Sequence, residues 1–330
     1  RFPLDLLVRD VKAVEPNTND TLLSLERLKV ELRLWKLLKK EVEIEEISIR
    51  NATFDTRDFI DGVVVNGHLG ELYLESHGVV FSPETARINE FSVKNTDVSL
   101  TLENMEDTDT TTTEPIYWKI LLDEIDFENV GFALNMPQDS LFVRTMLPKT
   151  TLKDGVIDLK EASYYVKSFD MDNAELAYGP KEELSLKKIG LQLDSIYYCG
   201  RDIRANVEEF VFKERSGLEL VSTEGRIASD SVLIQIPKFT MKTTASSLDL
   251  QTKIGWDVLE MKKTGVLSAK INAEIGKGDV AKILGGRDTL FLQTYPNKPF
   301  VFRVDAEGDL NRLRLRTLEA GLAKAFELKA

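Results

Sequence analysis

Histidine and cysteine, the side chains that most often act as bases, nucleophiles or metal ligands, are scarce in this sequence. The two histidines, His68 and His77, each stand next to a glycine, where we expect strand ends, and their separation matches no metal-site spacing. The single cysteine, Cys199, follows the apolar stretch that begins at Ile196, which favours a packed strand residue over a nucleophile. No Ser/His/Asp or Cys/His set is assembled, and we predict that the chain is not an enzyme.

Two short motifs resemble ion-binding loops but break the required pattern. Asp170-Met171-Asp172-Asn173 is similar to the start of a calcium loop, yet Ala174 and Glu175 stand where a ligand and a glycine are needed. Gly276-Lys277-Gly278-Asp279 precedes a predicted short helix, but it lacks the spacing of a phosphate loop, and its aspartate would repel an anion. The first motif predicts a polar strand face, and we expect neither a metal nor a cofactor.

Composition narrows the class of partner. The 330 residues are 42% hydrophobic and 30% charged, so the chain can fold and has a large solvated surface. The net charge of −12 disfavours nucleic acid and a broad anionic membrane surface as partners. No run approaches the roughly 18 apolar residues that would span a bilayer. Because the chain begins with Arg1, we expect it to be an excerpt of a longer protein.

Short apolar–polar alternations separated by turn residues predict an all-β protein of about twenty strands. Residues 22–35 fit both a strand and a helix, and we favour a strand that ends in one helical turn at Trp35. Asp279–Leu284 predicts one short helix that begins at Asp279 and is stopped by Gly285, and Leu290–Tyr295 predicts a strand. Residues 105–115 predict a mobile loop between an N-terminal β segment, 1–104, and its continuation, 116–330.

One eight-residue pattern recurs: apolar-x-apolar-x-Asn-x-x-apolar. Its copies are 47–54, 91–98, 125–132 and 169–176, and looser copies with a charged residue in place of the Asn are 157–164, 184–191 and 234–241. The last apolar residue comes five positions after the second, so strict alternation would place it on the opposite face of a strand. One extra residue near the Asn, as in a β-bulge, restores the phase and bends the strand.

Asparagine suits such a bend because it tolerates the left-handed backbone region better than most residues. We therefore predict bent strands, with the bends at Asn51, Asn95, Asn129 and Asn173. The alternative is that each Asn marks a turn between two ordinary strands. The predicted apolar lining consists of Ile47, Ile49, Phe54, Phe91, Val93, Val98, Ile125, Phe127, Phe132, Phe169, Met171 and Leu176. This face must meet a second sheet, fold over on itself or hold a ligand, and an ordinary dry core is the competing interpretation.

The segment from Asp20 to Phe54 resembles the N-terminal part of AsmA-like proteins, in particular the TamB branch found in Bacteroidetes-type bacteria. The resemblance depends on an amphipathic strand, a Leu-Trp-x-Leu-Leu turn at 34–38 and an apolar-x-apolar-x-Asn-Ala strand at 47–52. It implies an elongated, strongly curved antiparallel sheet, a U-shaped hydrophobic groove with one or two short helices. It also implies a periplasmic location and an inner-membrane anchor outside this chain.

The function implied by the resemblance is that of a groove segment that conducts phospholipids between the inner and outer membranes. The bent apolar strands agree with it, because acyl chains could take the place of a missing second sheet. An alternative function is a scaffold for the assembly of outer-membrane β-barrel proteins with a TamA-like partner. A third alternative, a glycan-binding adhesin, depends on Trp118, Trp256, Tyr197 and Tyr198.

Overall fold

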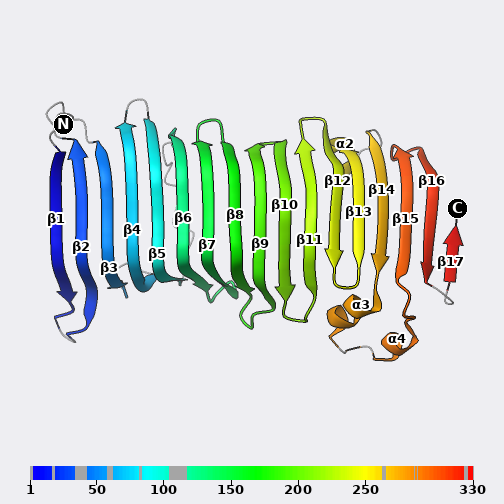
Figure 1. Cartoon of the computed structure of the whole chain (residues 1–330), viewed down its shortest axis with the longest axis horizontal. Helices are drawn as coiled ribbons and strands as arrows, with labels where there is room; N and C mark the ends of the chain where they lie inside the picture. The colour runs from blue at the N-terminus through cyan, green and yellow to red at the C-terminus, as the bar shows by residue number, and fades with distance from the viewer. Residues whose placement is uncertain are drawn as a thin grey trace. The chain divides into compact units, whose positions relative to one another are not determined.

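The structure of the chain is a computed structural model that describes residues 3–16, 19–33, 43–57, 62–81, 84–103, 117–261, 265–285, 287, 289–322 and 326–329. Its strands make up 76% of the residues and belong to one 17-stranded sheet, and the described residues contain three short helices (Figure 1). The all-β prediction is therefore confirmed. The prediction of one or two short helices is wrong by at least one, because α2 (Trp256–Leu259), α3 (Lys277–Leu284) and α4 (Thr289–Thr294) all form.

The described residues form two compact units, Arg1–Leu186 and Lys187–Ala330, which we call unit 1 and unit 2. The division falls inside β9, and the sequence does not indicate it. The strands of unit 1 are β1 (Pro3–Val14), β2 (Thr21–Arg33), β3 (Ile44–Asp55), β4 (Val63–Phe81), β5 (Glu84–Leu102), β6 (Lys119–Met136), β7 (Leu141–Asp158) and β8 (Ser163–Tyr178), followed by the start of β9 (Leu184–Cys199). Those of unit 2 are β10 (Asp202–Glu214), β11 (Glu219–Ser229), β12 (Leu233–Thr243), β13 (Ser247–Gly255), β14 (Leu267–Ile275), β15 (Phe300–Gly308), β16 (Leu313–Leu322) and β17 (Phe326–Lys329).

Strands that follow one another in the chain pair with one another, and nearly all of these pairs are antiparallel. The exception is β5 with β6, which pair in parallel, Phe91 opposite Ile125. The prediction of an antiparallel sheet is therefore wrong at this one pair. A parallel pair needs a connection that returns to the starting end of the sheet. That connection contains residues 104–116, so the predicted mobile loop lies outside the described residues.

The parallel pair also explains the spacing of the repeat. Ile47 and Phe91 are 44 residues apart (91 − 47), as are Ile125 and Phe169 (169 − 125), whereas Phe91 and Ile125 are only 34 apart (125 − 91). In the first two cases a complete antiparallel strand, β4 or β7, separates the copies. In the third case no strand intervenes, so two copies lie directly side by side. All four copies consequently run in the same direction.

Other predicted elements are partly confirmed. Residues 21–33 form the strand β2, as favoured, while the helical turn predicted at Trp35 lies outside the described residues. The helix α3 ends at Gly285 in the left-handed conformation, as predicted, but it begins two residues before Asp279. The strand predicted at Leu290–Tyr295 is wrong, because these residues form the helix α4 and the residue after it.

Candidate functional site

The four copies of the repeat lie on β3, β5, β6 and β8 and come into register across unit 1. Their apolar residues form three cross-strand rows. The first row contains Leu6, Val30, Ile47, Leu74, Phe91, Ile125, Leu152 and Phe169. The second contains Val8, Leu28, Ile49, Leu72, Val93, Phe127, Thr150 and Met171. The third contains Ala13, Leu23, Phe54, Gly67, Val98, Phe132, Thr145 and Leu176. All twelve predicted lining residues belong to these rows, which we call the apolar face of unit 1.

The apolar face of unit 1 is only partly shielded from solvent. Val93, in the second row, is 7% exposed, whereas Phe132, in the third row, is 39% exposed. Most of the other predicted lining residues are half-buried. The rings of Phe91 and Phe127 meet edge to face with their centres 6.2 Å apart. The described part of unit 1 contains no helix and no second sheet, so no described layer of unit 1 covers this face.

The four asparagines of the repeat lie in the left-handed backbone region, as the sequence predicts. Their φ values are 46° for Asn51, 50° for Asn95, 54° for Asn129 and 54° for Asn173. Each sits within a continuous strand, so the alternative of a turn between two strands is wrong. Burial follows the predicted change of phase: in β3, for example, Arg50 and Asn51 are both exposed, while the next residue is buried.

The bends differ from β-bulges in one respect. A bulge sets two residues of one strand against one of its neighbour and shifts the register. The register of unit 1 does not shift at these positions, since Arg27 pairs with Arg50 and Leu25 with Ala52. In β4, for instance, Gly70 lies opposite Asn51, between the pairs Arg50–Glu71 and Ala52–Leu69. The apolar pattern of each strand therefore changes face at the same level of the sheet as that of its neighbour. The asparagines are therefore left-handed as predicted, but the predicted extra residue relative to the neighbouring strand is wrong.

We call Asn51, Asn95, Asn129 and Asn173 the bend row. Side chains of this row make hydrogen bonds on the polar face of unit 1, which lies opposite its apolar face. The amide of Asn129 donates a hydrogen bond to Oδ1 of Asn95 over 3.2 Å, and the amide of Asn51 donates to Glu26 of the neighbouring strand. These contacts join adjacent strands where the left-handed residues interrupt the regular pairing. The asparagines thus act in the structure of the sheet and face away from its apolar side.

The looser copies form three different structures. Lys188 in β9 has a φ of 52° and repeats the left-handed bend. Glu161 lies in the turn between β7 and β8, so the copy at 157–164 is not a bent strand. The copy at 234–241 contains a true register shift between Ile236 and Phe239. Of the looser copies, only the one at 184–191 repeats the left-handed bend.

Unit 2 has an apolar face that the sequence analysis did not identify. One cross-strand row of this face contains Gly225, Phe239, Leu250, Ile271, Val304 and Leu318. A second contains Thr223, Met241, Leu248, Ala273, Phe302 and Ala320. The alternation of Ile234 and Ile236, resumed one residue out of phase at Phe239, is the sequence signal that could have revealed it. These rows contain more small side chains than those of unit 1.

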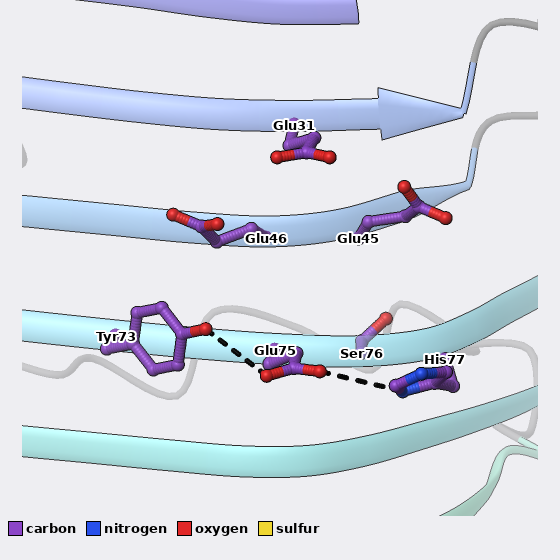
Figure 2. A pocket seen from close by; sticks show the side chains of 7 residues that line it. All are labelled: Glu31, Glu45, Glu46, Tyr73, Glu75, Ser76 and His77. Carbon is purple, nitrogen blue, oxygen red and sulfur yellow. Dashed lines mark hydrogen bonds and ion pairs between the residues drawn. The ribbon is translucent and has the colours of Figure 1, made fainter. Parts of the chain in front are cut away.

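The polar face of unit 1 carries a row of carboxylates. Directly opposite one another on successive strands are Asp5, Glu31, Glu46, Glu75, Glu90 and Glu124. Figure 2 shows part of this row in a pocket between β2, β3 and β4, with Tyr73 and His77 beside Glu75. Lys29 neutralises part of the charge, because its Nζ lies 3.2 Å from Glu31 and 2.9 Å from Glu46.

Two pKa shifts follow from these contacts. Burial, together with the charges of Glu75 and Glu46, raises the pKa of Tyr73 to about 12, so its hydroxyl stays protonated and donates to Glu75 over 3.2 Å. The hydrogen bond to Glu46 raises the pKa of Lys29, which therefore keeps its charge. The carboxylates of this pocket thus face the cation Lys29 and the hydroxyl donor Tyr73.

The remaining chemistry candidates are dispersed. His68 and His77 are exposed and lie within β4, not at strand ends as expected, and Cys199 is the half-buried last residue of β9. Asp170 and Asp172 are exposed on β8, in keeping with a polar strand face. The residues that the structure describes contain no group of three or more His, Cys, Asp or Glu side chains that could hold a metal ion.

Comparison with known proteins identifies no relative: no family model matches the chain, and no curated protein matches it at significant similarity. Among the helices in the described part of the chain, none is both long and apolar enough to cross a membrane. The resemblance to AsmA-like proteins therefore remains a prediction from residues 20–54.

Proposed function

We propose that the apolar face of unit 1 binds the acyl chains of phospholipid. The observation that supports this proposal is the alignment of three apolar rows on one side of a single sheet that no described helix or second sheet of unit 1 covers. A sheet normally buries its apolar face against another layer. Acyl chains supply such a layer, and each CH₂ removed from water contributes about 0.8 kcal/mol.

The wider role that we propose rests on the same face and on the resemblance of residues 20–54 to the TamB branch. In it, the chain is a periplasmic portion of an inner-membrane-anchored envelope protein, and its lipid-binding face forms part of a path for phospholipids between the two membranes. The net charge of −12 fits a face that holds acyl chains by burial rather than by a cationic headgroup site. Nucleic acid is not a partner in this proposal.

The test is native mass spectrometry with lipid extraction on the full chain, purified from bacterial cells without detergent. We expect phospholipid to copurify with the native protein and to be lost from Phe127→Asp and Phe132→Asp, which place a charge on the apolar face. Ala133→Asp is the matched control, because it places the same charge on the opposite side of the same strand. Circular dichroism checks that each variant folds.

A stable native protein without lipid would contradict the proposal and favour a dry core. Equal loss of lipid from Phe132→Asp and Ala133→Asp would contradict it as well, because the effect would not depend on the face. The barrel-assembly scaffold with a TamA-like partner predicts instead that both folded variants keep their effect on client proteins. That alternative has no support from a particular contact among the described residues, and it stays a prediction from the resemblance.

A further inference from the structure

The helices α3 and α4 form an insert between β14 and β15 of unit 2, residues 277–295, which we call the helical insert (Figure 1). Its base is firmly attached to the sheet. Asp279, 2% exposed, accepts hydrogen bonds from the hydroxyls of Thr243 and Ser246 in the β12–β13 turn. At the other end, the hydroxyl of Tyr295 donates to the carbonyl of Ile275 over 2.9 Å. The insert is therefore a fixed projection.

Large apolar side chains point from this projection into solvent. Leu290 is 76% exposed, Ile283 is 67% exposed and Phe291 is also exposed. Burial of one such side chain is worth roughly 1.5–3 kcal/mol, so three of them exposed on one attached insert indicate a surface that contacts something apolar. The acyl-chain face of unit 1 lies on other strands, so these side chains are not part of the site proposed above.

The charges of the insert distinguish it from the rest of the chain. Within the insert the cations are Lys277, Lys282 and Arg287, and the acids are Asp279 and Asp288, of which Asp288 is outside the described residues. Asp279 is buried against hydroxyls and lies 3.7 Å from Nζ of Lys282, whereas Arg287 is exposed. A cationic, apolar projection on a protein of net charge −12 is complementary to a surface that is anionic outside and apolar inside.

We propose that the helical insert docks on the surface of an anionic phospholipid bilayer. Ile283, Leu290 and Phe291 enter the acyl region, while the exposed Arg287 remains at the level of the headgroup phosphates. Long cationic side chains reach such a level readily, because their aliphatic stems lie along apolar surface while the charged ends stay in water. This contact goes beyond the binding of single lipid molecules, since it places unit 2 on a membrane. It differs from the expectation, drawn from overall charge, that a broad anionic membrane surface is disfavoured.

The test is flotation of the full chain with vesicles of phosphatidylcholine alone and of phosphatidylcholine with phosphatidylglycerol. We expect binding to the anionic vesicles, and roughly tenfold weaker binding by Leu290→Asp. Arg287→Glu should weaken binding to anionic vesicles alone. The matched control is Met261→Asp, which changes a residue of unit 2 that is 81% exposed but lies outside the insert, and which should bind like the native chain.

Three results would overturn the proposal: no binding by the native chain, unchanged binding by Leu290→Asp, or equal binding to neutral and anionic vesicles. Phe127→Asp separates this inference from the proposed function. If both hold, Phe127→Asp loses its copurified lipid but still floats with anionic vesicles. If the insert alone is wrong, the native chain contains lipid and does not float.

Discussion

The apolar faces of unit 1 and unit 2 achieve the same change of phase by different means. In unit 1, left-handed residues occupy one row across the sheet, and the register is preserved through every bend. In unit 2, the change in β12 is a bulge between Ile236 and Phe239, which shifts the register against β13. Within the described parts of β10–β17, Gly308 is the only residue with a positive φ, so these strands have no such aligned row.

The difference shows that one arrangement depends on a repeated sequence and the other on individual contacts. An aligned row of bends requires a matching residue in strand after strand, which a repeat supplies. A single bulge needs only one local irregularity. Substitutions in the two units should therefore have different effects, and four predictions test this comparison.

The largest effect is expected from Val93→Asp in unit 1. Val93 is 7% exposed in the middle of the second apolar row, and a carboxylate there has no cation opposite it, since its neighbours are Leu72 and Phe127. We expect a loss of at least about 3 kcal/mol in the free energy of unfolding of unit 1. Hydrogen exchange followed by mass spectrometry should show protection lost in β3–β8 and retained in β11–β15.

Val93→Ala is the control, with an expected loss of roughly 1.5 kcal/mol from the two carbon atoms removed. Loss of protection in both units by Val93→Asp would contradict the view that they are separate units of stability. Equal effects of the two substitutions would show that position 93 is not shielded by its neighbours.

The second prediction concerns the attachment of the helical insert in unit 2. Asp279→Ala removes the acceptor for Thr243 and Ser246, and hydrogen bonds to charged groups are worth about 1.5–3 kcal/mol. We expect faster hydrogen exchange in α3 and unchanged exchange in unit 1. Asp279→Asn, which keeps one acceptor oxygen, should have a smaller effect.

The pH dependence of this attachment has a definite sign. Burial alone would raise the pKa of Asp279, but the hydrogen bonds from Ser246 and Thr243 and the charge of Lys282 outweigh it and lower the pKa below its ordinary value of 3.8. A lowered folded-state pKa stabilises the fold above the ordinary value, and this contribution is lost as the pH falls through the folded-state pKa. The protection of α3 against exchange, measured relative to the intrinsic rate at each pH, should thus fall in acid in the native chain, and Asp279→Asn should abolish that fall. A loss of protection in acid that persists in Asp279→Asn would contradict this origin.

These predictions use parts of the structure that differ in how well the sequence reveals them. The phase of the repeat and the left-handed asparagines could be predicted, because each depends on the local pattern within one strand. The parallel pairing of β5 and β6 could not, since the pattern of a strand does not record the direction of its neighbour. The helix α4 was mistaken for a strand because its short apolar run fits both structures.

The third prediction tests the bend row directly. Asn95→Val places a β-branched residue at a φ of 50°, where such side chains clash with the backbone, and should cost about 1–2 kcal/mol of stability in unit 1. Asn95→Gly, which tolerates this conformation, is the control and should cost less. The comparison with unit 2 is Lys238→Val: Lys238 is exposed at the bulge and has no positive φ, so its replacement should have little effect. Chemical denaturation measures all three, and a larger loss in Lys238→Val than in Asn95→Val would contradict the distinction between the two kinds of bend.

The smallest change in stability is expected on the polar faces. Removal of a carboxylate charge there should stabilise unit 1 but should not stabilise unit 2. Glu90 lies directly between Glu75 and Glu124 in the carboxylate row of unit 1. Like charges opposite one another destabilise a sheet, so Glu90→Gln should stabilise unit 1 by about 0.2–1 kcal/mol, and less at high salt. In unit 2, Glu319 lies opposite Arg303 at 2.8 Å, so Glu319→Gln should leave stability unchanged or lower it by up to about 1 kcal/mol. Chemical denaturation at low and high salt distinguishes the two cases. If Glu90→Gln were destabilising, attraction to nearby cations would outweigh the repulsion within the carboxylate row. The polar faces of the two units would then be equivalent.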